Sequence, residues 1–509
     1  MRYIAYIWML LLAFPLVANA EKVTNVILEN SESLSFDKNR GASIQVLKGN
    51  VRFRHENAVM YCDSAYFYDG ENSFDAFGRV KVVQADSLTV LCNKMFYDGN
   101  TRLLRARGNV IMDNHKFKLY TENFDFYRDA NYGYYFNGGK IVDPQYELTS
   151  DRGYYYPSSK KAAFRGNVNL VSTSFTVKSD TMLYNSRTDV ASLVGPSNVY
   201  YSDYTVYTEN GWAGTKSNDG ALYDYSVITS KSGTKVTADS IKFNKNQGWA
   251  KAYHNLVMTD SAKGVEVYGD YGYFVQEPQM AIVTDRPYAK KYAPNEDTLY
   301  LHADTLKYVA VDSTEKLMRA YYNVRFFRPD IQGKCDSLIY STSDSIMQMH
   351  KAPIIWSEQN QLSGEQINVR MDGSSPKEIH ITSKAMIIAK AEGLVGVDID
   401  CYNQLSSRES FGYVENNQLR RIDMKGMAHS IYFPENKDGG DAMMNVAEGN
   451  LMQIYLKNKK LEKIVMKPRP KGVLYPLSKV EKRDMYLRDF FWSEKDRPSS
   501  WKDIFRHTK

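Results

Sequence analysis

A carboxylate recurs along the chain just ahead of a short apolar segment, and paired carboxylates are the working groups of many hydrolases. The segment ADSIKF at residues 238–243 returns with small changes as CDSAYF (62–67), SDTMLY (179–184), ADTLKY (303–308) and CDSLIY (335–340). A catalytic pair is specific to one place, whereas this Asp comes back in unit after unit. An Asp at the start of a strand can accept hydrogen bonds from the backbone of the entering turn. The recurrence therefore favours a structural corner over a catalytic site.

Other residues that could perform chemistry are scattered through the sequence. The eight histidines, among them His254, His302 and His380, form no H-E-x-x-H or H-x-H group. The sequence also has no G-x-S-x-G element and no glycine-rich phosphate loop. We therefore expect no catalytic residue, no metal site and no cofactor, and read each histidine as a surface or core residue.

The four cysteines are Cys62, Cys92, Cys335 and Cys401. Their spacing fits no zinc pattern, and an exported chain of this length with so few cysteines is not a disulfide scaffold. Cys62 and Cys92 occupy equivalent positions in the repeat described below, so we expect them to stack near each other. Their spacing does not say whether they are bonded.

Composition narrows the class of protein. With 509 residues, of which 43% are hydrophobic, the chain is long enough for several domains or one long repeat array with a packed core. The 39 tyrosines suit strands better than helices. A net charge of +6, with both signs mixed along the chain, argues against nucleic-acid binding.

The first residues have the pattern of an export signal. Arg2 is followed by an apolar stretch that ends in Ala18-Asn19-Ala20, which matches an A-x-A cleavage site. The stretch is short for a membrane anchor and contains a proline. We expect a signal peptide at residues 1–20 and a mature protein outside the cytoplasm. The resemblance described below implies the periplasm as its location, free or in association with the outer membrane.

The recurring acid marks a repeat of roughly thirty residues. Weaker copies occur at Asp151 and Asn210. Each anchor shares strand parity with apolar residues two and four positions later, such as Ala65 and Phe67 after Asp63, which predicts that the anchor begins its strand on the inward side. The anchors form a predicted corner ladder of Asp63, Asn93, Asn123, Asp180, Asp239, Asp270, Asp304 and Asp336.

Each unit also carries a second strand centred on Gly-Asn-Val or a relative of it, as in LKGNVRF (47–53) and ARGNVIM (106–112). Counting by twos places Leu47, Val51 and Phe53 on one face, and Lys48 and Arg52 on the other. One face is therefore apolar and the other solvated, and helical periodicity is absent. A glycine in mid-strand indicates a kink or a narrow place where facing sheets approach.

The order and spacing of these patterns along the sequence suggest four segments. After the signal peptide we expect a first β-repeat region at residues 21–290, because the segment RPYAKKYAPNEDT (286–298) interrupts the pattern with two prolines and several charges. A second β-repeat region at 291–477 ends in hairpin-like units. Residues 478–509 are expected to form a charged C-terminal tail, as a short helix or a flexible end.

The combination of Ala-Asp-Ser/Thr-apolar-x-Tyr with Ala-x-Gly-Asn-Val-x-apolar resembles the LptA/OstA family of lipopolysaccharide-transport proteins. The resemblance runs from about residue 46 to 369, with the later hairpins continuing to 466, and the organisation is similar to the long OstA-like proteins of the Bacteroidetes type. It implies an all-β, repetitive jelly-roll fold that resembles a solenoid, V-shaped in section, with an apolar interior groove. Individual motifs are short, so the resemblance rests on their repetition.

The resemblance also implies a function and partners. We expect the inward residues to line a groove that shields acyl chains of lipopolysaccharide or a lipid A-type glycolipid, in a bridge between the inner and outer membranes. Expected partners are other OstA-fold transport proteins at both membranes and further copies of this chain, joined head to tail at exposed strand edges. The expected groove-lining residues are Val51, Phe53, Val80, Val82, Val110, Met112, Val168, Leu170, Met182, Ile241, Phe243, Leu306 and Leu338.

Three other interpretations remain open from the residues alone. The same inward side chains could form a closed core with no room for a ligand. A β-repeat adhesin or scaffold at the cell surface would need the repeat and the signal peptide but no groove. A β-helical carbohydrate-active enzyme would need one carboxylate pair distinct from the ladder, and the sequence shows none.

Overall fold

The structure, a computed structural model, describes residues 24–506 apart from 37–43, 85–87, 295, 374, 417, 437–439 and 458–459. Across these residues the chain forms strands β1 to β37, and its helical elements are short 3₁₀ segments. The all-β prediction is therefore confirmed. The signal peptide expected at residues 1–20 lies outside the described residues. Within the described ranges no helix is long and apolar enough to cross a membrane.

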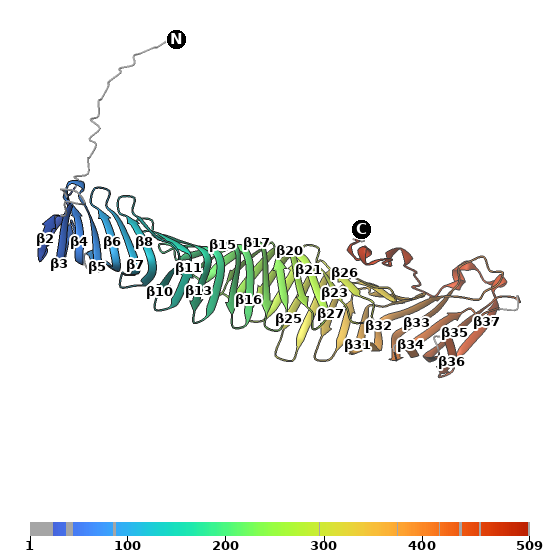
Figure 1. Ribbon diagram of the computed structural model, residues 1–509. Coiled ribbons are helices and arrows are strands. Elements are labelled where there is room, and N and C mark those ends of the chain that lie inside the picture. The colour runs from blue at the N-terminus through green and yellow to red at the C-terminus, as the bar shows by residue number, and fades with distance from the viewer. Residues whose placement is uncertain are drawn as a thin grey trace, which may run out of the picture. The chain divides into compact units, whose positions relative to one another are not determined.

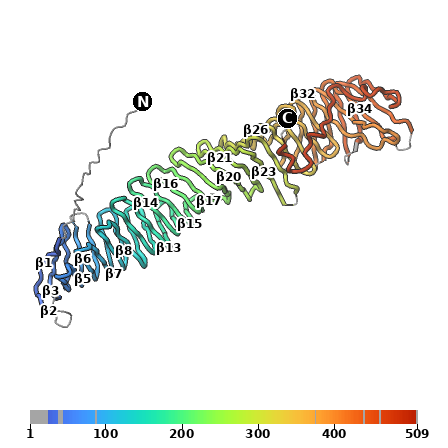
Figure 2. The backbone as a smooth tube through the Cα atoms, turned by 90° about the horizontal axis from the view of Figure 1, so that it is seen from above, coloured from blue at the N-terminus to red at the C-terminus, as the bar shows by residue number. Residues whose placement is uncertain are grey.

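The chain divides into two compact units, the first ending at Thr188 and the second beginning at Asp189 (Figure 1). Successive long strands of the first unit pair antiparallel, so the chain runs back and forth in layers. Figure 2 shows this winding from above. The strands of the first unit are β1 (Ile27–Asn30), β2 (Ser33–Phe36), β3 (Ile44–His55), β4 (Ala58–Tyr68), β5 (Ser73–Gln84), β6 (Leu88–Asp98), β7 (Leu103–Asp113), β8 (Lys118–Tyr127), β9 (Tyr132–Tyr135), β10 (Gly139–Val142), β11 (Tyr146–Ser150), β12 (Arg152–Tyr156), β13 (Lys161–Ser172) and β14 (Phe175–Asn185), with the 3₁₀ segment η1 (Asp69–Glu71).

The second unit continues the same design with β15 (Val190–Tyr201), β16 (Tyr204–Gly214), β17 (Asp219–Ser230), β18 (Lys235–Ala238), β19 (Ser240–Asn244), β20 (Trp249–Asp260), β21 (Val265–Val275), β22 (Met280–Thr284), β23 (Tyr288–Lys291), β24 (Leu299–His302), β25 (Thr305–Ala310), β26 (Lys316–Arg328), β27 (Ile331–Ser341), β28 (Ile346–His350), β29 (Ile354–Ser357), β30 (Asn360–Ser363), β31 (Gln366–Asp372), β32 (Ser375–Lys390), β33 (Tyr402–Glu415), β34 (Gln418–Tyr432), β35 (Met443–Lys457), β36 (Lys460–Lys467) and β37 (Lys471–Pro476). It ends in the 3₁₀ segments η2 (Leu477–Lys479), η3 (Lys482–Met485), η4 (Glu494–Asp496) and η5 (Trp501–Phe505).

The segment with two prolines, which suggested a boundary near residue 290, lies inside the second unit. Pro287 stands just before β23 and Pro294 lies in the connection between β23 and β24. Neither proline removes a donor from a ladder, and pairing continues across the segment, from β22 to β25 and from β23 to β24.

The Gly-Asn pair of each second strand forms a β-bulge. In β3 the φ angles of Gly49 and Asn50 are 80° and 44°, and the register with β4 shifts between Lys48 and Val51. Only glycine adopts such angles without strain, and asparagine tolerates them better than other residues, which explains the dipeptide. The bulge bends the strand and forms a corner, so each repeat of the stack has two arms, one on each side of the corner. In β27 the first arm pairs with β29 and the second with β28.

The bulge also decides which side chains point inward. Leu47, Val51 and Phe53 are completely buried while Lys48 is exposed, as period-two counting predicted for β3. In the facing strand β4 the parity changes at the corner, because Cys62 before it and Ala65 after it are both buried.

The anchor acids do not begin their strands on the inward side, and that prediction is wrong. Asp63 lies in the middle of β4 with a side chain that is 45% exposed. Asn93, Asn123, Asp180, Asp270 and Asp336 also lie within strands, and only Asp239 and Asp304 directly precede one. The bulge of the neighbouring strand turns each acid away from the interior.

Side chains from both arms of the repeats fill the interior between the arms. In the first unit, aromatic rings fill the space, and the Phe53 and Phe74 centroids are 4.2 Å apart with nearly parallel planes. In the second unit, aliphatic side chains from opposite arms share one cluster, as Ile355 in β29 and Ile367 in β31 do. The arms therefore face each other across a common interior.

Candidate functional site

The anchor acids form polar contacts with the bulge of the next layer. Asp63 accepts hydrogen bonds from the guanidinium of Arg79, with Nη2 at 2.8 Å from Oδ1. These bonds hold the pKa of Asp63 below its ordinary value. A Cβ atom added to Gly78 would lie 2.6 Å from Asp63 Oδ2, so the acid occupies the space that glycine leaves free.

Similar contacts recur along both units. In the first unit Asn167 Nδ2 donates to Asp151 at 2.9 Å. In the second unit Asn255 donates to Asp239 and Asn323 donates to Asp304, both at 2.8 Å. Each acid thus holds the bulge of its neighbour, which is a structural role.

The remaining anchors have weaker or different contacts. A Cβ atom on Gly108 would lie 3.0 Å from Asn93 Nδ2. Asp270 accepts a hydrogen bond from the Asn255 backbone at 3.2 Å, and Lys351 lies 3.2 Å from Asp336. The Asn123 N–H donates to Thr121 Oγ1 and its carbonyl accepts from the Phe136 N–H, both at 3.4 Å, and Asp180 accepts from Thr181 at 3.2 Å.

The thirteen residues expected to line a groove lie on the inward side or close to it, but they do not line the large cavity described below. Nine are buried, from Val51 and Phe53 at 0% exposure to Val82 and Leu338 at 6%. Met112, Leu170, Phe243 and Leu306 are partly buried. In this structure they are core residues packed by their neighbours, and contact with a lipid remains a prediction for them.

A cavity of about 1110 Å³ lies in the second unit, bordered by residues from β26 to β37 and by the connection before β24. Its volume exceeds the roughly 300–1,000 Å³ of ordinary small-molecule pockets. One wall is a row of paired aliphatic residues that ends at Leu405, which pairs with Ser430 of β34. Isoleucines of β34 and β35, namely Ile422, Ile431 and Ile454, also line the cavity. The row comprises Ile355, Leu362, Ile387 and Leu405, each paired with the next across neighbouring strands.

The cavity forms here because the aromatic residue of this wall points the other way. Trp356 lies next to Ile355 in β29, so its side chain is on the outer face of the same arm. It is completely buried there, and its Nε1 donates to Gln361 at 3.2 Å. The inner face is left with Ile and Leu side chains, which are too short to fill the space that Phe53 and Phe74 fill in the first unit.

Charged side chains also border the cavity. Arg328 and Asp330 form a two-point ion pair, with Nε–Oδ1 at 2.6 Å and Nη2–Oδ2 at 2.9 Å. Glu358 and Lys471 are further members of the lining. The cavity therefore combines an aliphatic wall with charged groups, as a site for an amphipathic molecule requires.

The C-terminal segment (residues 477–506) carries the short 3₁₀ segments η2 to η5, which agrees with the short-helix alternative of the sequence analysis. It lies along the outer face of the cavity wall, beside strands β24 to β33 (Figures 1 and 2). Gln404 donates to the Met485 carbonyl and accepts from the Leu487 N–H, both at 2.8 Å. Gln361 binds the carbonyl of Phe491 and the N–H of Ser493 in the same way, at 2.8 and 2.9 Å.

Further contacts complete this attachment. Arg497 Nε donates to Gln332 at 2.8 Å, and the Trp501 ring stacks on Tyr300 at 5.4 Å between centroids. Met485 and Ile504 are buried at 2% and 0% exposure. The segment therefore covers an outer face that would otherwise expose Trp356.

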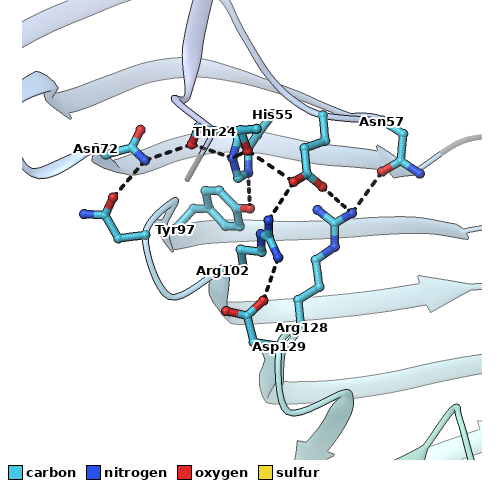
Figure 3. A network of polar contacts seen from close by, with 10 residues as sticks. Thr24, His55, Asn57, Asn72, Tyr97, Arg102, Arg128 and Asp129 are labelled. Atoms are coloured by element: carbon cyan, nitrogen blue, oxygen red, sulfur yellow. Dashed lines mark hydrogen bonds and ion pairs between the residues drawn. The ribbon is translucent and has the colours of Figure 1, made fainter. Parts of the chain in front are cut away.

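One polar network was missed by the sequence analysis (Figure 3). His55 Nδ1 lies 2.6 Å from the Tyr97 hydroxyl, and His55 Nε2 lies 2.7 Å from Thr24 Oγ1. Burial lowers the pKa of His55. Glu56 beside it bonds the guanidinium of Arg102 at 2.9 Å. The imidazole is completely buried and its two nitrogens are engaged, so the network ties the N-terminal residues to β3.

The cysteines show no sign of chemistry. All four are free and buried. Burial raises the pKa of Cys62 to about 12 and that of Cys92 to about 11, which keeps both thiols protonated and unreactive. Within the described ranges, no three His, Cys, Asp or Glu side chains come together in a way that could hold a metal ion.

Comparison with known proteins adds a family. A family model described as OstA-like protein matches residues 23–180. Among similar solved structures is LptH, described as the LptA-homologous periplasmic component of the lipopolysaccharide transport device of Pseudomonas aeruginosa. The two chains are 16% identical, with 24% of this chain and 83% of LptH covered and a TM-score of 0.21. The fold described above therefore rests on the strand pairings and not on this likeness.

Curated proteins gave no match to the chain. The family model covers the part in which the acid ladder and the Gly-Asn bulges are most regular. Residues 23–180 of the chain are therefore similar to the OstA-like family.

Proposed function

We propose that the chain is a periplasmic transport protein that shields the acyl chains of lipopolysaccharide, or of a lipid A-type glycolipid, inside its β-stack. The observation that carries this proposal is the aliphatic cavity of about 1110 Å³ in the second unit. The similarity of residues 23–180 to the OstA-like family supports the same class of function, and it favours a carrier over an adhesin or an enzyme. No bond needs to be made or broken.

The energetics suit a carrier. Each methylene that leaves water for the cavity contributes about 0.8 kcal/mol, so a chain of ten methylenes gains about 8 kcal/mol. The row from Ile355 to Leu405 offers similar aliphatic contacts in successive strands. A lipid can therefore shift between neighbouring positions without meeting one deep minimum.

Site-specific photo-crosslinking tests this proposal. A benzophenone amino acid at Leu405, which lines the cavity, should form adducts with lipopolysaccharide. The matched control is Arg408, which lies three residues later in β33 and is exposed. Adducts at Arg408 alone would refute the proposal. Leu405→Trp should fill part of the cavity and reduce lipid binding by tenfold or more without unfolding the stack.

Association with partners is proposed from the strand edges. In the first unit β2 pairs with β3 and exposes Leu34 and Phe36, at 46% and 59%. In the second unit β37 pairs with β35 and exposes Val473 and Leu474, at 49% and 52%. Exposed apolar edges are templates for strand addition, by a second copy joined head to tail or by another OstA-fold protein at either membrane.

Sedimentation of the wild type against Val473→Pro tests this association. Proline at the edge removes a backbone donor and should weaken self-association at least tenfold. A wild-type chain that stays monomeric at high concentration and binds no protein of the same fold would contradict the proposal.

A further inference from the structure

The residues that line the cavity reach the surface in two places, and these places differ in charge. The first lies on the connections that precede β24, β27 and β30, and its exposed residues are Glu296, Asp297, Asp330 and Glu358. The second lies on β36, on β37 and on the connection between them, and its exposed residues are Leu461, Ile464, Pro470, Lys471 and Gly472. The cavity therefore meets solvent beside an acidic group and again at the last two strands of the second unit (Figure 1).

The chain around this second opening is strongly basic. Residues 457–471 include seven lysines and arginines and one glutamate, a net charge of +6 that equals the net charge of the whole chain. Outside this segment, positive and negative side chains balance. The last four basic residues of the segment, Lys463, Lys467, Arg469 and Lys471, are all exposed.

These charges lie directly beside the apolar lining of the opening. Lys463 precedes Ile464 and Lys467 follows Met466, and both neighbours line the cavity. Arg469 precedes Pro470, which lines the cavity as well. Consecutive Cα atoms are about 3.8 Å apart, and long basic side chains extend along apolar surface toward polar groups. Several positive charges can therefore approach a group held at this opening.

Few carboxylates compensate this charge. Lys471 Nζ lies 3.1 Å from Glu448 Oε1, and Glu462 is the single acidic residue of the segment. In the part of the chain that the structure describes, Lys463, Lys467 and Arg469 form no ion pair. Both strands pair with β35, so no further strand of the second unit covers their outer edges. The positive charge is thus available to a ligand.

We propose that this basic opening binds a phosphate group carried by an amphiphile whose acyl chains lie in the cavity. Arginine pairs with phosphate through two parallel hydrogen bonds, and lysine binds it as a point charge. The inference rests on the proposed function, because it requires that acyl chains enter the cavity. It adds the chemical class of the headgroup and its place, since the acidic opening would repel an anion. The amphiphile lies with its phosphate beside β36 and β37.

The test measures binding of defined amphiphiles to the full-length mature protein by calorimetry, below their critical micelle concentrations. The probes are dodecyl phosphate and its neutral dimethyl ester, which carry the same chain. In 0.1 M salt, wild type should bind dodecyl phosphate roughly tenfold more tightly, as several exposed charge contacts allow. The preference should shrink in 1 M salt, where the Debye length falls from about 10 Å to about 3 Å.

Two triple variants locate the effect. Replacing Lys463, Lys467 and Arg469 by Gln should remove the preference and leave binding of the neutral ester unchanged. Lys471 is kept because it pairs with Glu448. The matched control replaces Lys94, Lys161 and Lys235 by Gln, three exposed lysines on strands that do not border the cavity. It removes the same charge and should retain the preference.

Inorganic phosphate and vesicles of phosphatidylglycerol distinguish other sources of the anion. Inorganic phosphate should bind at least tenfold more weakly than dodecyl phosphate, since it lacks the chain. Equal binding of the two would mean a site for free anions and would overturn the proposal. Loss of vesicle binding in the basic triple variant, with the preference for dodecyl phosphate intact, would assign the charges to a membrane surface and also overturn it.

Failure of the inference is distinguishable from failure of the proposed function. If neither amphiphile binds, the proposed function fails and the inference fails with it. If both bind equally, or if the preference survives in the basic triple variant, the inference is overturned while the proposed function stands. Equal loss of the preference in the control variant would show an effect of net charge alone and would overturn the inference too.

Discussion

Replacing Gly78 by alanine should destabilise the first unit for two separable reasons. The φ angle of Gly78 is 72°, and an L-residue in the left-handed region costs about 1–2 kcal/mol. The new Cβ would also lie 2.6 Å from Asp63 Oδ2, which forces the carboxylate away from the Arg79 guanidinium. Overpacking of this kind adds about 1–3 kcal/mol, so the total loss should be about 2–5 kcal/mol.

Two other glycines of the first unit separate these terms. Gly138 has a φ angle of 95° but no atom within 4 Å of a Cβ, so Gly138→Ala should cost about 1–2 kcal/mol from backbone strain alone. Gly70 has neither feature, and Gly70→Ala should be nearly neutral. In an Asp63→Ala background, Gly78→Ala should destabilise the protein by no more than Gly138→Ala does.

Native-state hydrogen exchange is the appropriate assay, because repeat stacks open segment by segment. Exchange of the β4, β5 and β6 amides should accelerate most in Gly78→Ala. If Gly78→Ala is no more destabilising than Gly138→Ala, or if its excess persists without the Asp63 carboxylate, the acid does not explain the glycine and the ladder argument is refuted.

Three further results are expected. Gln361→Leu removes two hydrogen bonds to the backbone of the C-terminal segment, each worth about 1 kcal/mol, so trypsin should cleave that segment at least tenfold faster; Gln404→Leu should act alike, and unchanged cleavage would count against the attachment. Because burial raises the pKa of Cys62 to about 12 and that of Cys92 to about 11, both thiols should resist labelling at pH 8 until the protein unfolds; rapid labelling of the native protein would show that they are accessible. Burial lowers the pKa of His55 in the folded protein below its unfolded value of about 6.5, so the unfolded state binds the proton more readily. Thermal stability should therefore fall as the pH drops below about 6.5, and His55→Gln should remove that part of the pH dependence. An identical pH profile in the variant would contradict this prediction.

The sequence carried enough information for the strand pattern and for one face of each unit. Alternation alone placed Val51 and Val110 inside, because a strand keeps its parity where the bulge adds a pair of residues. The same reasoning failed for Asp63. Its parity with Ala65 is real, but the facing bulge turns the strand between them. The glycine in mid-strand indicated a kink. Which of two neighbouring strands changes the parity of its inward-facing residues at the kink depends on how the strands pair.

The cavity and the docked C-terminal segment were beyond reach of local patterns. Residues such as Val80 and Leu405 follow the same alternation, and only the size of the facing side chains decides whether the interior is filled or open. Gln361 and Phe491 meet although 130 residues separate them. Trp501 stacks on Tyr300, a partner that tertiary packing brings to it from a distant part of the chain.

The most direct measurement is a structure of the mature chain determined with bound lipopolysaccharide. Our account predicts density for acyl chains along the row from Ile355 to Leu405, with the sugar outside the stack. Acyl chains found only on the outer faces, with the cavity filled by water or closed by its own side chains, would contradict it.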